Sequence, residues 1–298
     1  MRTPIRWAPS SDALHTIYQS LVGEPQQWPS PAILEAPTTE EHRRRAADAW
    51  GRRVQANYLT AQWSASLTER LSRLGAPLDL LAGSAYAAEE WTRQLSIAVH
   101  LHQPLPTATP LSVPDQLFAE RHFGPCRWES VFEQALELYG FNLTLSVPIY
   151  DAVAAVSSDP AVTDLCMAAV DSLRELHSFG ELLLRWCRED LPARTTAHGQ
   201  QRIPHLLANY EQLCEGSPAI LDELAGHEIT VETRPGNLGT LRPTHLAAIF
   251  YDSLHQSIFP LFESLGWSGL DAWQQHYRHV PEDRNAPAVI AAAGISPR

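Results

Sequence analysis

The sequence lacks lysine altogether, because all 22 of its basic residues are arginines. An enzyme that holds pyridoxal phosphate or a carbonyl substrate as a lysine Schiff base is therefore excluded for this chain. The glycine-rich loops that bind phosphates in Walker and dinucleotide-binding folds are missing as well, so we expect no nucleotide cofactor. A net charge of −12 without a basic patch cannot replace the counterions of phosphate, so we also expect no nucleic-acid partner.

Long apolar runs and paired cysteines are absent too. The sequence has no run of 18 apolar residues and no secretory signal pattern, so we expect a cytoplasmic protein that makes no membrane contact. Its four cysteines are dispersed and show no Cys-x-x-Cys spacing, which predicts small buried apolar residues rather than disulfides or metal ligands. They are Cys126, Cys166, Cys187 and Cys214.

Four long segments carry apolar residues three and four apart, with charged residues on the opposite face, which is the pattern of amphipathic helices. The segments cover about 41–74, 78–101, 128–156 and 161–189. Gly75 lies at a natural helix end, Pro148 predicts a kink in the third helix, and Pro160 follows a good N-cap. The predicted fold class is therefore all-α, with a proline-rich connection before the third helix that crosses the end of a bundle.

The flanking segments extend this helical domain, which we place at 39–280. Residues 1–38 are rich in proline and predict an arm around the bundle, and residues 281–298 predict a flexible tail. Additional helices are expected between about 203 and 278, and an alternating stretch predicts a brief strand or loop. The additional helices are Ile203–Cys214, Pro218–Leu224, Pro243–Leu265 and Asp271–Arg278, and the alternating stretch is His227–Arg234.

Each of the four predicted long helices carries a short motif, namely Trp50–Tyr58, Ala88–Arg93, Gly140–Val147 and Phe179–Trp186. These motifs resemble those of the ferritin-like superfamily of di-iron carboxylate bundles. The tail from Gly239 to Trp273 is similar to the closing helix pair of one ferritin-like group among small-molecule biosynthesis enzymes. The resemblance covers roughly residues 41–280 and implies a ferritin-like four-helix bundle with additional C-terminal helices.

The resemblance also places this chain's residues at the positions of the family's metal ligands. Such a site takes a glutamate from each of two helices and a Glu-x-x-His pair from each of the other two. The aligned residues here are Asn57, Glu90, Arg93, Asn142 or Leu143, Leu173 and Leu176. Arginine repels a metal, asparagine is a weak donor and leucine cannot ligate, so we expect no metal cofactor.

The primary hypothesis is a metal-independent enzyme of small-molecule biosynthesis. In it Glu90 is the general acid or base, Arg93 holds Glu90, and both Arg93 and the amides of Asn57 and Asn142 orient a carbonyl or stabilise an oxyanion. Polar residues on one side and leucines on the other predict a one-sided pocket for a small organic substrate. Cyclisation, isomerisation, elimination and hydrolysis are within reach of these groups.

Further residues were placed around this pocket. Leu173 and Leu176 form its apolar wall, and Tyr58 and Tyr86 lie beside Asn57 and Glu90 in the helical projection and would donate hydrogen bonds to a ligand. His177 adjoins the apolar stripe of the fourth helix and can act as an acid or base near pH 7.

Other interpretations of the same residues stay open. The polar groups could serve only to stabilise the core, since ion pairs and amides can fill the space that a metal leaves. In another register Glu90, Glu175 and His177 would hold iron or manganese in a di-iron oxygenase or oxidase. A third interpretation is a non-catalytic metabolite-binding or scaffold protein, and in each case the bundle could form a homodimer.

Overall fold

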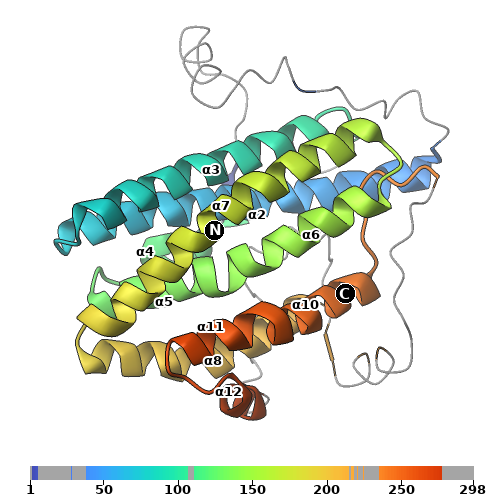
Figure 1. Ribbon diagram of the computed structural model, residues 1–298. Coiled ribbons are helices and arrows are strands. Elements are labelled where there is room, and N and C mark those ends of the chain that lie inside the picture. The colour runs from blue at the N-terminus through green and yellow to red at the C-terminus, as the bar shows by residue number, and fades with distance from the viewer. Residues whose placement is uncertain are drawn as a thin grey trace, which may run out of the picture.

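The computed structural model describes residues 2–5, 28, 38–106, 111–214, 216–217, 220, 224 and 235–276. Within these ranges the chain is mostly helical, as predicted (Figure 1). Most of the predicted arm, the predicted strand or loop over 227–234 and the predicted tail over 281–298 lie outside the described residues. The same holds for most of the predicted helix over 218–224.

The first two long helices form an antiparallel pair. Helix α2 spans Glu40–Arg73, and the hydroxyl of its N-cap residue Thr39 accepts a hydrogen bond from the backbone N–H of His42 at 3.2 Å. Gly75 follows with a φ of 75°, a conformation that glycine adopts without strain at a helix end. Helix α3 spans Leu78–His102 and lies along α2. Both helices match their predicted ranges to within one residue.

The connection after α3 has more structure than the sequence predicts. It contains strand β2 at Ser112–Pro114, a 3-10 turn η2 at Asp115–Leu117 and the short helix α4 at Ala119–His122. Strand β1 at Arg2–Pro4 pairs antiparallel with β2, with Thr3 opposite Val113. The start of the chain is therefore tied to this connection.

The third long segment is continuous but irregular. It consists of α5 at Trp128–Ala135, a π-helical segment η3 at Leu136–Asn142 and α6 at Leu143–Val156. Pro148 lies inside the α-helix α6, six residues after the end of the π-helical segment, and the kink there stays a prediction. A π-helical turn inserts an extra residue, which changes the direction of the side chains that follow.

The fourth long helix, α7 at Pro160–Asp190, begins as its N-terminal pattern predicts. The Asp159 carboxylate accepts from the backbone N–H groups of Ala161 and Val162 at 2.9 and 3.3 Å. The predicted apolar stripe is buried, and the arginines and the glutamate assigned to the opposite face are exposed. The buried residues are Leu165, Ala169, Leu173, Leu176, Gly180 and Leu183.

A second layer of helices packs against α5 and α6 (Figure 1). It contains α8 at Ala193–Leu213, α10 at Pro243–Ser253, the π-helical segment η4 at Leu254–Ile258, α11 at Phe259–Ser264 and α12 at Gly269–His276. Helix α8 begins ten residues before the predicted start at 203, because its polar first turns give little periodic signal. Gly199 lets this early part approach closely, since a Cβ there would lie 2.9 Å from the Phe132 ring.

Three tryptophans fill the core along α2 and α3. Trp50, Trp63 and Trp91 are each at most 1% exposed. The indole N–H of Trp50 donates to the Leu238 carbonyl at 2.8 Å, and that of Trp63 donates to the Leu117 carbonyl at 2.6 Å. Helix α2 thereby holds two loops that are distant in sequence.

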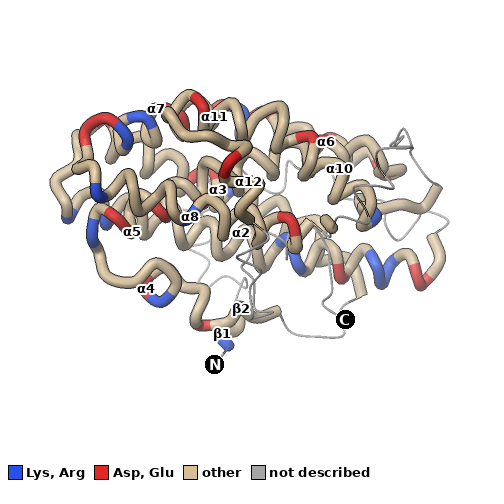
Figure 2. Tube along the Cα trace, turned by 90° about the horizontal axis from the view of Figure 1, so that it is seen from below, with Lys and Arg blue, Asp and Glu red and all other residues tan. Residues whose placement is uncertain are grey.

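The cysteines are mostly buried thiols, as the sequence predicts, and charges of both signs lie on the outer helices. All four cysteines are free thiols, three of them buried and Cys126 partly buried. In the view of Figure 2, arginine positions lie between acidic positions along the outer helices. None of the described helices has both the length and the apolar character that a membrane crossing needs.

Replacing Gly180 with alanine should destabilise the fold. A Cβ at this position of α7 would lie 2.8 Å from the Cβ of Tyr139, which is fixed to the buried segment η3. Overpacking of this kind costs about 1–3 kcal/mol and should outweigh the better helix propensity of alanine. Urea unfolding of Gly180→Ala measures the loss, and Leu182→Ala on the exposed face of the same helix should change stability by less than about 0.5 kcal/mol. A Gly180→Ala protein as stable as the parent would contradict this packing.

Candidate functional site

The structure distributes the predicted site residues over three separate places. Asn57 and Asn142 line a small cavity between α2 and α6, which we call the interior cavity. Glu90 and Arg93 form an ion pair on α3. His177 lines a larger cavity between α6, α7 and α10, which we call the α6–α10 cavity.

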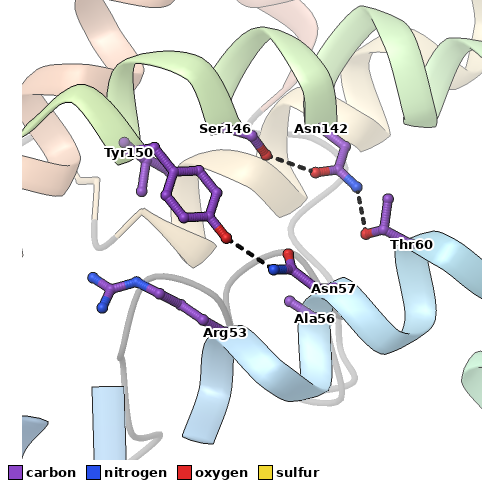
Figure 3. Close-up of a pocket in the computed structure, with 8 residues that line it drawn as sticks. Arg53, Ala56, Asn57, Thr60, Asn142, Ser146 and Tyr150 are labelled. Atoms are coloured by element: carbon purple, nitrogen blue, oxygen red, sulfur yellow. Dashed lines mark hydrogen bonds between the residues drawn. The ribbon is translucent and has the colours of Figure 1, made fainter. Parts of the chain in front are cut away.

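The interior cavity is bounded by polar side chains from two facing helices (Figure 3). Its lining residues are Arg53, Ala56, Asn57, Thr60, Asn142, Ser146, Ile149 and Tyr150. The amide of Asn57 donates to the Tyr150 hydroxyl at 2.8 Å and to the Gln94 carbonyl at 3.0 Å. The amide of Asn142 donates to the Thr60 hydroxyl at 2.8 Å. The two asparagines that the resemblance places at former ligand positions thus lie at one cavity.

The interior cavity is too small for the organic substrate that the sequence predicts there. Its volume is about 10 Å³, which corresponds to about one water molecule. The Tyr150 ring and Ile149 occupy the space beside Asn57, and Ser146 donates to the Asn142 oxygen at 3.1 Å. The two asparagines are hydrogen-bonded to their neighbours, and little room is left between the lining side chains.

Glu90 and Arg93 are paired as predicted but do not line the interior cavity. Nη1 of Arg93 lies 3.0 Å from Oε1 of Glu90, and the Glu90 side chain is only 1% exposed while that of Arg93 is 37% exposed. Burial raises the pKa of Glu90 above its usual value, and Arg93 and the Ser172 hydroxyl offset only part of this effect. The pair lies between α3 and α7, where Gln94 also donates to Ser172 at 2.9 Å.

The two tyrosines do not belong to a ligand pocket. Tyr58 packs edge-on against Phe118, with 6.5 Å between ring centroids. Tyr86 is 42% exposed and donates a hydrogen bond to Glu175 at 3.2 Å. Neighbours in a helix point about 100° apart, so a residue beside Asn57 in sequence faces another part of the protein. Leu173 and Leu176 are fully buried in the core and stand apart from both cavities.

The α6–α10 cavity is the larger of the two, with a volume of about 280 Å³. This is close to the lower end of ligand-binding cavities, which span roughly 300–1,000 Å³. Its lining combines hydroxyls, one amide, one carboxylate and one imidazole with a small apolar part. The lining residues are Thr144, Val147, Pro148, His177, Ile249, Asp252, Ser253, Gln256 and Ser257.

His177 is the one residue of the α6–α10 cavity that the sequence predicts as a site residue. It is half-buried on α7, and burial lowers its pKa below the usual value, with Glu181 offsetting part of the shift. The imidazole is therefore neutral at pH 7 and able to accept a proton. It lies five residues after Ser172, about 140° around the helix, so it faces away from the Glu90–Arg93 pair.

One π-helical segment lines the α6–α10 cavity, and the other ends two residues before a lining residue. Gln256 and Ser257 belong to η4, and Thr144 follows η3 by two residues. π-Helical turns inside α-helices occur frequently at functional sites because they redirect side chains. The sequence shows no pattern that separates such a turn from an α-helix, which is why these lining residues were missed.

Two histidine–glutamate hydrogen bonds elsewhere were also missed. Nε2 of His122 lies 3.2 Å from Oε2 of Glu137, and the His122 ring stacks on Trp63. Nε2 of His276 lies 3.0 Å from Oε2 of Glu211, whose other oxygen accepts from Tyr251 at 2.7 Å. These pairs fix α4 to η3 and α12 to α8, and no pattern in the sequence marks either of them.

The alternative metal ligands are only partly brought together. Glu175 lies near enough to Glu90 to raise the pKa of Glu90, and it accepts a hydrogen bond from Tyr86. His177 lines the α6–α10 cavity instead. In the part of the chain that the structure describes, no three His, Cys, Asp or Glu side chains form a group that could hold a metal ion. Iron or manganese binding stays a prediction of the alternative hypothesis.

Comparison with known proteins found no matching family model, no similar curated protein and no similar solved structure. The resemblance to the ferritin-like superfamily therefore rests on the motifs in the sequence.

Replacing Glu90 with glutamine should make the stability of the fold less dependent on pH. The folded-state pKa of Glu90 lies above its usual value of 4.5, so the folded state binds this proton more tightly than the unfolded chain. The contribution of the protonated carboxyl is full below that usual value and is lost as pH rises through the folded-state pKa. Glu90→Gln should match the parent near pH 4 and exceed its unfolding free energy at pH 7 by on the order of 1 kcal/mol.

Denaturant unfolding at both pH values measures this difference. Glu89→Gln, on the exposed neighbour, removes the same charge and should change the pH dependence much less, because Glu89 adds only a small part to the raised pKa of Glu90. A Glu90→Gln protein that loses stability at pH 7 would instead show that the ion pair with Arg93 stabilises the fold.

Proposed function

We propose that this chain is a metal-independent enzyme that applies acid–base chemistry to a small organic molecule in the α6–α10 cavity. The single observation that carries the proposal is the neutral, half-buried imidazole of His177 in a cavity of about 280 Å³ lined with hydroxyl groups. A general base must be unprotonated at working pH and must reach its substrate. His177 meets both conditions.

The rest of the lining suits substrate orientation. Thr144, Ser253 and Ser257 offer hydroxyls, Gln256 offers an amide, and Val147, Pro148 and Ile249 offer an apolar wall. A few polar groups in a partly apolar cavity are the usual composition of a small-molecule site. Proton transfer by one histidine supports isomerisation, elimination, cyclisation or hydrolysis, the reactions that the sequence motifs suggest.

In this proposal Glu90 and Arg93 are structural and not catalytic. A carboxylate that is 1% exposed beside a core with no room for a substrate cannot meet a reacting atom. Its partner Arg93 reaches partly to the surface and relieves the cost of the buried charge. We therefore assign the role of general acid or base, which the sequence predicts for Glu90, to His177.

We further propose that the fold is a ferritin-like bundle whose metal site has been replaced. The long helices α2, α3 and α7 and the η3–α6 segment lie side by side, and Asn57 and Asn142 meet between them. Leu173 and Leu176 lie in the core of α7 where the family would have ligands. Leucine cannot bind a metal, so the residue types support a metal-independent protein. A cytoplasmic location, a possible homodimer and the absence of a nucleic-acid partner belong to the same proposal.

A cavity-filling variant should test this function. We expect a fragment library of small ketones, lactones, carboxylates and amines to yield ligands that bind the parent protein and raise its Tm. Ser257→Trp should remove this binding because the indole fills the cavity, whereas Ser178→Trp, on the exposed face of α7, should retain it. Ligand-observed NMR measures binding, and mass spectrometry of the incubated ligands measures conversion.

The His177→Gln variant separates catalysis from binding. It should bind the same fragments while any conversion falls by at least 100-fold, the usual share of a general base. In the parent protein, conversion should rise with pH through a pKa below that of free histidine, because the neutral imidazole is the reactive form. Binding without conversion would identify a binding protein, and equal binding by the two tryptophan variants would rule out the cavity.

A further inference from the structure

Arg53 is a buried cation without a carboxylate partner. Its side chain extends from α2 beneath the Tyr150 ring (Figure 3), and the residue is 1% exposed. Nη2 donates to the Gly239 carbonyl at 2.8 Å, and the guanidinium lies 4.4 Å from the centre of the Trp50 ring. Its Nε and Nη1 groups are buried and have no hydrogen-bond partner, and no acidic side chain in the described ranges forms an ion pair with it.

The groups nearest to Arg53 cannot balance its charge. Burial lowers the pKa of Arg53 to about 10, so it remains protonated at pH 7. Tyr150 and Cys166 would have to ionise to act as anions, but burial raises the pKa of each to about 12. Both are therefore neutral at pH 7. Buried charges in proteins are ordinarily paired, because removal from water without a partner is costly.

Arg70, the other buried arginine of α2, differs from Arg53 because both of its terminal nitrogens donate hydrogen bonds. Its Nη1 donates to Ser130 and Gln134, and its Nη2 donates to the Gly124 carbonyl. None of its nitrogens is both buried and without a hydrogen-bond partner. In the described ranges, Arg53 is the only arginine that has two buried nitrogens without a hydrogen-bond partner.

We propose that the interior cavity binds one halide ion, chloride in particular, as the counterion of Arg53. Arg53 lines this cavity together with Asn57 and Tyr150. The Tyr150 hydroxyl accepts from Asn57, so its own proton is available for an anion. A volume of about 10 Å³ is about that of one water molecule, so chloride, which is somewhat larger, enters only with a small outward shift of the lining side chains, and phosphate, sulfate and carboxylates are excluded. This site is separate from the α6–α10 cavity and does not depend on the proposed reaction.

Halide binding would also support the fold around Arg53. The carbonyls of Leu238 and Gly239 accept from Trp50 and Arg53, so the loop before α10 is held by these two side chains of α2. An ion that binds only the folded state raises its stability in proportion to the logarithm of ion concentration.

The test is thermal unfolding in sodium chloride and in sodium gluconate at the same ionic strength, because gluconate is too large for the cavity. We expect the Tm to rise by about 2–5 °C when chloride reaches ten times its dissociation constant. Bromide should act in the same way. Arg53→Met should abolish the difference between the two salts, whereas Arg44→Met, which removes the same charge from an exposed position of α2, should keep it.

A second measurement covers the case in which Arg53→Met does not fold. Crystals of the parent protein grown in sodium bromide should show an anomalous peak beside Arg53, Asn57 and Tyr150, and Tyr150→Phe should weaken the chloride effect on Tm several-fold. The same Tm in chloride and gluconate, together with no bromide peak at this position, would overturn the proposal and leave water as the occupant.

Discussion

The side-chain amide of Asn57 joins three helices at one point. From α2 it donates to the main chain of α3 at Gln94 and to the Tyr150 hydroxyl of α6. Asn142 makes a similar bond from η3 to Thr60, a turn further along α2. An unmade hydrogen bond in such a core costs about 1–3 kcal/mol, so these amides fix the register of α2 against the η3–α6 segment. The remaining helices are arranged around that register.

The register also determines where the open space lies. Because α2 and α6 are bonded to each other across the core, only about 10 Å³ remains between them. The opposite side of α6 faces α10, and about 280 Å³ remains there beside the π-helical segment η4. The proposed site of ligand chemistry therefore lies in the outer layer of helices, where His177 is the available base.

The sequence predicts the long helices well because their ends carry strong local patterns, such as Thr39, Gly75 and Asp159 followed by Pro160. The resemblance also places Asn57 and Asn142 at one pocket, and in the structure both line the interior cavity. It could not show which helix faces His177, because periodicity gives the direction of a side chain within its own helix and not its neighbour. Arg53 lies on the same side of α2 as Trp50 and Asn57, and this spacing could have identified its side chain as buried. The burial is easily missed, because an arginine is usually taken for a surface residue.

The composition and the core are connected through the choice of arginine. A buried lysine can escape the cost of its charge by losing a proton, since its pKa falls readily on burial. The Arg53 guanidinium keeps its proton at pH 7 even though burial lowers its pKa to about 10. In a chain whose basic residues are all arginines, a cation in the core therefore stays charged and must be balanced by dipoles, an aromatic face or an anion. At Arg53 the carbonyl of Gly239 supplies a dipole and the ring of Trp50 supplies an aromatic face. The unpaired N–H groups are free to bind an anion.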